Sequence, residues 1–152
     1  MKVTGLNRRH LVNYVTAVFA SMMFSVATYA EHPANQVSAD AKIFIVEPVD
    51  GAIVPATFTV KFGASNVDIV PAGVVQENAG HHHLLIDVDE LPALNAPLPA
   101  TNQIIHFGKA QTETEITLAP GTHSLQLVLG NFAHVPHATP VISKKITITV
   151  EE

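Results

Sequence analysis

The sequence has no cysteine and no tryptophan, and its tyrosines, methionines and arginines all lie within the first thirty residues. Without cysteine the chain forms no disulfide, and without thiolate or thioether donors beyond that point it lacks the ligands that favour Cu(I) and blue-copper sites. Without arginine after residue 30 the predicted domain has no bidentate clamp for phosphate, and without tryptophan or tyrosine there it has few rings for stacking sugars or bases. Carboxylates, hydroxyls, amides, lysines and histidines remain for specific chemistry.

Residues 1–30 have the pattern of an export signal. A basic start is followed by an apolar stretch, and the sequence ATYA ends in small residues suited to signal peptidase. We expect cleavage after Ala30 and a periplasmic or secreted protein. The alternative is an uncleaved membrane anchor, because residues 11–30 are long enough to cross a bilayer.

Cleavage would leave 122 of the 152 residues, which is enough for one domain with a hydrophobic core. Three of the 8 basic residues would leave with the signal and all 13 acidic residues would stay, so the mature net charge would be 5 − 13 = −8. An acidic chain with no basic run is a poor candidate for nucleic-acid binding, which needs Lys and Arg to neutralise phosphates. We expect no membrane association after cleavage.

The predicted domain, residues 42–152, has a hydrophobic period of two rather than 3.6. Apolar residues alternate with polar ones in 56–62, 112–118 and 142–150, and the continuous apolar run at 42–47 predicts a buried strand. Short strands separated by proline and glycine turns predict an all-β fold, a single antiparallel immunoglobulin-like β-sandwich of about seven strands. Two stretches lack this pattern. Residues 31–41 are expected to form a flexible N-terminal segment, and residues 89–102 form a long proline-rich connection of a kind that is often functional.

Eight of the nine histidines follow the signal sequence, and three of them are consecutive. Strand alternation places His81 and His83 on one face, and His82 on the apolar face with Leu84 and Ile86. We therefore predict that His82 is buried and hydrogen-bonded. Side chains at i and i+2 of a strand can meet one metal ion from one side, so His81 and His83 are candidate ligands.

The remaining histidines differ in their surroundings. His134 and His137 lie three residues apart in a proline-bounded loop, where functional residues are frequent, although solvated loop histidines are the alternative. His106 precedes Gly108 at a predicted strand end. His123 lies on an apolar face where immunoglobulin-like sandwiches often have a tyrosine that bonds back to the backbone, and we interpret it as a structural substitute for that tyrosine.

Three stretches of sequence match a known pattern. GHHHLLID, HFGKAQTETEITLAPGTHSLQLVLGN and HVPHATPVISKKITITV closely resemble the bacterial domain-of-unknown-function family 4399, over about residues 75–150. The preceding FIVEPVDGAIVPATFTVKFGAS is similar to the first strands of exported immunoglobulin-like domains. The resemblance implies a fold and no reaction. It implies that the histidines of the family pattern are His81, His82, His83, His106, His123, His134 and His137.

As a set, the histidines predict a site for a divalent transition metal, with Zn(II) or Cu(II) as the expected ion. The predicted ligands are His81, His83, His134 and His137, with His106 as a fifth. The function would be metal binding, delivery or sequestration outside the cytoplasm, and the expected partner is the metal ion or an extracytoplasmic protein. The alternative is a structural or partner-binding module without metal, in which the histidines brace loops by hydrogen bonds.

Catalysis is the less favoured expectation, and we predict no catalytic residues. The sequence has no G-x-S-x-G elbow, no cysteine nucleophile and no glycine-rich phosphate loop. A Ser–His–Asp triad stays open, because Ser124 and Asp87 are present. A metal-dependent enzyme would need an open coordination position on its ion.

Overall fold

The computed structural model describes residues 32–152, so the predicted signal sequence lies outside the described residues. Its one helix over this range is the short 3₁₀ helix η1 (Pro33–Asn35). Over the same range, no helix has the length and apolar character needed to cross a membrane.

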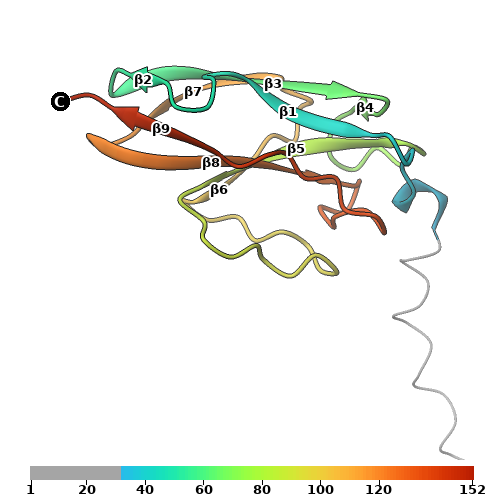
Figure 1. Ribbon diagram of the computed structural model, residues 1–152. Coiled ribbons are helices and arrows are strands. Elements are labelled where there is room, and N and C mark those ends of the chain that lie inside the picture. The colour runs from blue at the N-terminus through green and yellow to red at the C-terminus, as the bar shows by residue number, and fades with distance from the viewer. Residues whose placement is uncertain (1–31) are drawn as a thin grey trace, which may run out of the picture.

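Two β-sheets make up the rest of the regular structure, and Figure 1 shows them as two layers. The smaller sheet has the strand order β1-β3-β7, and the larger sheet has the order β2-β9-β8-β5-β4, with β6 also paired to β5. The strands are β1 (Lys42–Glu47), β2 (Ile53–Val54), β3 (Thr57–Ser65), β4 (Asp68–Ile69), β5 (Ala79–Ile86), β6 (Ile104–His106), β7 (Glu113–Thr117), β8 (Gly121–Gly130) and β9 (Ile146–Val150).

The predicted all-β, two-sheet architecture is confirmed, with two corrections. The described residues form nine strands rather than about seven, because β2, β4 and β6 have only two or three residues each. The sheets are not wholly antiparallel, since β2 pairs with β9, and β4 with β5, in parallel. Such short pairings leave little periodic signal in a sequence.

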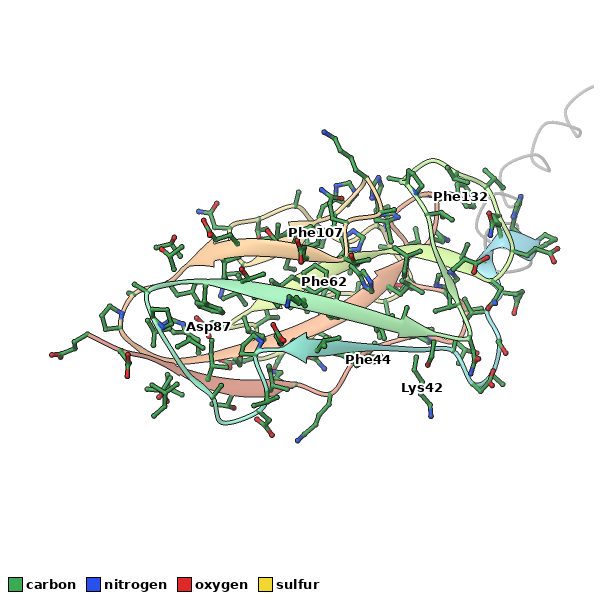
Figure 2. The ribbon with its side chains drawn as sticks, turned by 90° about the horizontal axis from the view of Figure 1, so that it is seen from above. Lys42, Phe44, Phe62, Asp87, Phe107 and Phe132 are labelled. Carbon is green, nitrogen blue, oxygen red and sulfur yellow. The ribbon has the colours of Figure 1, made fainter. Side chains whose placement is uncertain are left out.

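The core between the sheets follows the predicted alternation. Phe58, Val60 and Phe62 of β3 are buried and face the larger sheet, where β8 and β9 bury their own alternate residues. The ring of Phe62 lies 4.9 Å from that of Phe107, measured between centroids, and both are labelled near the centre of Figure 2. Burial of these apolar faces is the main stabilising contribution to the fold.

Strand β1 is less buried than its continuous apolar run predicts. Ile43 is buried, but Phe44 and Val46 are 44% and 45% exposed. The prediction of a buried strand was wrong because β1 is an edge strand whose outer face has no layer over it. The Phe44 ring instead lies over the backbone of its neighbour at Gly63.

Strand β5 is buried along its whole length, because both faces of the larger sheet are covered there. One face meets the sandwich core. The opposite face is covered by the long connection between β5 and β6, which Figure 1 shows on the side away from the smaller sheet. Leu98 of this connection packs with Leu85, Ile104 and Val128 in a second apolar cluster.

The segment at 31–41, predicted to be flexible, contacts the sandwich over the part that the structure describes. Ala34 and Asn35 of η1 are buried. The side-chain amide of Asn131 donates a 2.9 Å hydrogen bond to Oδ1 of Asn35, and the backbone N–H of Ala138 donates to the Asn35 carbonyl. These bonds join the N-terminal segment to the loop that follows β8.

Candidate metal centre

Strand β5 presents two buried imidazoles on its outer face. His81 is 0% exposed and His83 is 2% exposed, and alternation places both on the side opposite His82. Their ring centroids are 4.9 Å apart. The predicted pairing of these two histidines on one face is therefore seen in the structure.

Two further imidazoles come from neighbouring segments. Strand β6 pairs antiparallel with β5 so that His106 stands directly opposite His83. Strand β8 pairs with the other edge of β5, where Gly130 stands opposite His81, and the loop after Gly130 carries His134. The register of β5 with its two neighbours thus brings four histidines from three segments together.

The four side chains are close enough to share one ion. One ligand nitrogen from each of His81, His83, His106 and His134 lies within 4.8 Å of the others. Nε2 of His81 is 3.1 Å from Nδ1 of His134. Two nitrogens bound to one tetrahedral Zn(II) are separated by about 3.3 Å, from Zn–N bonds of about 2.0–2.1 Å. The His81–His134 pair is already close to that separation, and no pair in the group exceeds 4.8 Å.

Two glycines leave space for these rings. A Cβ atom added at Gly130 would lie 2.6 Å from Cε1 of His83, and one added at Gly108 would lie 2.7 Å from Nε2 of His106. Any other residue at either position would displace the imidazole beside it. Glycine at these strand ends is therefore part of how the fold builds the site.

The loop at 131–137 is held by one buried amide. The side-chain oxygen of Asn131 accepts hydrogen bonds from the backbone N–H groups of Ala133 and Val135, and the Asn131 carbonyl accepts one from His134. His134 itself has a φ of 65°, a left-handed conformation that a residue other than glycine adopts at some cost. The hydrogen bonds of Asn131 fix this conformation and with it the position of the His134 ring.

Burial keeps the inner rings of the site neutral. Loss of solvation, together with a smaller effect of the neighbouring histidines, lowers the pKa of His81 to about 4 and that of His83 to about 3. Burial also lowers the pKa of His106, with a smaller effect from His134. Imidazole must be neutral to bind a metal, so the environment favours the ligand form at neutral pH.

His137, one of the four main predicted ligands, lies outside the group of four that the structure brings together. Its ring is buried, and its Nε2 lies 3.0 Å from the carbonyl oxygen of Ala79, to which it donates. This bond fastens the end of the 131–137 loop to the start of β5.

The other two family-pattern histidines face elsewhere. His82 is buried in the sandwich core with its ring centroid 5.3 Å from that of Phe62, as predicted. The predicted hydrogen bond is wrong, because neither ring nitrogen of His82 has a partner among the described residues. His123 makes the expected bond to the backbone, at 2.8 Å from the Ala119 carbonyl, and its Nδ1 lies 2.7 Å from a carboxylate oxygen of Asp87.

Sequence reasoning missed the three residues that shape the site rather than line it: Gly108, Gly130 and Asn131. A signal was present for the glycines, because each lies at a strand end beside a histidine segment, where a glycine often marks a close approach. The role of Asn131 depends on its contact with Asn35, 96 residues away, which no local pattern reveals.

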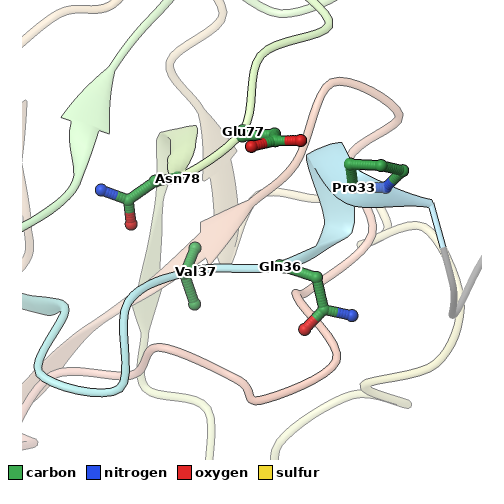
Figure 3. A pocket seen from close by; sticks show the side chains of 5 residues that line it. All are labelled: Pro33, Gln36, Val37, Glu77 and Asn78. Carbon is green, nitrogen blue, oxygen red and sulfur yellow. The ribbon is translucent and has the colours of Figure 1, made fainter.

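A pocket of about 390 Å³ lies away from the histidine cluster, and Figure 3 shows it beside η1. It is lined by Pro33, Gln36, Val37, Glu77 and Asn78. Glu77 is the one ionisable group in this lining, and no histidine belongs to it.

Comparison with curated proteins finds no match for the chain. Among solved structures, it is similar to the fibronectin(III)-like modules of Clostridium thermocellum CbhA, with 15% identity and a TM-score of 0.40, over 72% of this chain and 95% of that one. The model of one family matches residues 60–151, a span that includes all four clustered histidines. The chain therefore belongs to the family described as "Domain of unknown function (DUF4399)".

Proposed function

We propose that this protein is exported and binds a divalent transition metal, Zn(II) or Cu(II), through His81, His83, His106 and His134. Its role would be to hold, deliver or sequester that ion outside the cytoplasm. The observation that carries the proposal is the convergence of four imidazoles, with one nitrogen of each within 4.8 Å of the others. Ions of this class bind imidazole nitrogen well, and residues 32–152 contain no cysteine or methionine.

The unsatisfied nitrogens of the cluster count against a purely bracing role, although the His81 nitrogen without a partner, Nδ1, is not the one that faces His134. Nδ1 of His81 and Nδ1 of His83 are buried without a hydrogen-bond partner among the described residues. A buried polar atom without a partner lowers stability by about 1–3 kcal/mol. Histidines that served only to brace loops would be expected to use these atoms.

The rival function is a structural module, and a different set of histidines favours it. His123 bonds to Asp87 and Ala119, and His137 bonds to Ala79, so two histidines do brace loops in the described structure. These bonds lie outside the group of four. They are compatible with a metal site nearby. A measurement of metal binding therefore distinguishes the two proposed functions.

The decisive experiment is metal titration of protein purified without a histidine tag. We expect Zn(II) or Cu(II) to bind with a dissociation constant below about 10 µM, equivalent to roughly 7 kcal/mol. The paired change His81→Ala with His83→Ala should abolish binding, and so should His106→Ala, which alters an exposed residue and should leave the fold intact. His32→Ala removes an exposed histidine outside the cluster and serves as the matched control. Wild-type protein that binds no metal at this level would leave the structural module as the function.

The location of the protein is tested separately. Intact-mass measurement of protein recovered from outside the cytoplasm should give the mass of a chain that begins at Glu31. A mass that includes residues 1–30 would indicate a retained membrane anchor.

A further inference from the structure

A second pocket lies directly against the histidine cluster. It has a volume of about 240 Å³, and one side of it is formed by three of the four clustered rings: His83, His106 and His134. The other side is formed by three small or apolar residues of the β5–β6 connection: Leu98, Pro99 and Ala100. The imidazole cluster therefore opens toward a partly enclosed space rather than toward protein on every side.

The apolar side of this pocket is fixed in place. Leu98 is 7% exposed and is held in the second apolar cluster with Leu85 and Val128. The backbone N–H of Leu98 also donates a 3.0 Å hydrogen bond to the carbonyl of His134. The Leu98 segment and the His134 loop are thus held together by a hydrogen bond, so the fold itself maintains the space between them.

The charge of the ligand set determines what this space would accept. All four residues of the group are histidines, so the group contains no carboxylate and no thiolate. Imidazoles bind metal in the neutral form, so a divalent ion would keep its full charge of +2. The pocket lining contributes no acidic side chain to offset that charge. A partly buried and uncompensated cation attracts an anion more strongly than it would in water.

We propose that the metal-loaded site binds a small anion in this pocket, where the anion coordinates the ion beside His106 and His134 and lies against the Leu98–Ala100 wall. This inference rests on the proposed metal function and adds an open coordination position to it. The expected ligand class is a monoanion of a few atoms, because the fixed apolar wall limits its size and offers it no charged partner. An open position of this kind is what distinguishes a reactive metal site from a closed structural one.

The test uses the full chain loaded with Cu(II) and titrated with sodium azide, which gives a new charge-transfer absorption when it binds Cu(II). We expect saturable formation of this band in the wild-type protein and no azide response in the copper-free protein. Ala100→Phe fills the pocket from an exposed position, and it should weaken azide binding at least tenfold while changing Cu(II) affinity less than twofold. Ala100→Leu is a smaller filling change in case the phenylalanine variant does not fold. Ala93→Phe, an exposed change in the same connection but outside the pocket, is the matched control.

The outcomes separate the two proposals. Cu(II) binding with no azide band in the wild type would mean that the four histidines saturate the ion, which overturns the anion site and leaves the metal site standing. An equally strong azide band in Ala100→Phe would place the anion elsewhere on the ion and overturn the pocket assignment. Absence of Cu(II) binding would overturn both proposals.

Discussion

Nε2 of His81 and Nδ1 of His134 lie 3.1 Å apart, although 53 residues separate them in the chain. One nitrogen can donate to the other, or both can bind the same ion. In the second case the hydrogen bond is exchanged for two metal–nitrogen bonds without moving the backbone far. The fold thus brings these rings together without a metal, in an arrangement suited to take one up, which leads to the following expectations.

The fold should not require metal. The sandwich core is formed by apolar residues of both sheets and lies on the opposite face of β5 from the cluster. Chelator-treated protein should therefore keep a β-type circular dichroism spectrum and a cooperative melt. Added metal should stabilise it by about 2.7 kcal/mol at a free concentration 100 times the dissociation constant. An unfolded apo protein would instead indicate a structural site of the zinc-finger type.

Replacing His82 with leucine should stabilise the protein. Both ring nitrogens of His82 are buried without a partner among the described residues, so His82→Leu removes an unsatisfied polar group and keeps most of the packing against Phe62. We expect the free energy of unfolding to rise by about 1 kcal/mol. His82→Ala should lower it by about 2–4 kcal/mol, because it leaves a cavity. Chemical denaturation at pH 7 measures both, and a loss of stability in His82→Leu would show that the ring makes a polar contact that the leucine cannot replace.

Metal affinity should survive acidification better than in an ordinary histidine site. Four imidazoles with a pKa of about 6.5 would together lose about 10⁶-fold in affinity between pH 7.5 and pH 5, or about 30-fold each. Burial lowers the pKa of His81 to about 4 and that of His83 to about 3, so these two stay neutral at pH 5. The measured loss of affinity should therefore be smaller by about 10³-fold, because two of the four imidazoles are not protonated over this pH range. Competition titration with a chromophoric chelator at each pH measures it, and a full 10⁶-fold loss would contradict the prediction.

The contact between His123 and Asp87 should stabilise the fold most at low pH. The Asp87 carboxylate, and then the Ala119 carbonyl, raise the pKa of His123, because both ring nitrogens face acceptors and the protonated ring can donate to each. Since the folded pKa lies above the unfolded one, the contribution is complete below about pH 6.5 and is lost as the pH rises through the folded value.

The change Asp87→Asn isolates this contribution, because its side-chain oxygen can still accept from the backbone N–H of Ser124. The variant should be less stable than wild type by about 1 kcal/mol at pH 5.5, a modest value because the pair is partly exposed, and nearly equal to it at pH 9. Urea denaturation at the two pH values provides the comparison. A stability difference that does not change with pH would mean that His123 is neutral in the fold.

The sequence by itself determined the all-β class and the kind of ligand atom that the site offers. Alternation with a period of two placed His81 and His83 on one face and His82 on the other, because successive side chains of a strand point in opposite directions. The chain has no cysteine, and no methionine after residue 30, which excludes thiolate and thioether ligands from the predicted domain. These features are local or compositional, and so they can be read from a single chain.

Only the tertiary structure decided which histidines meet. His106 joins the cluster because β6 pairs with β5 in the register that sets it opposite His83, and a slip of one residue would turn its side chain to the other face. His134 joins because Asn131, itself bonded to Asn35, fixes the loop conformation, while the same loop turns His137 toward the Ala79 carbonyl. Strand register and loop conformation arise from contacts between distant segments, and a periodic pattern within one segment carries no information about them.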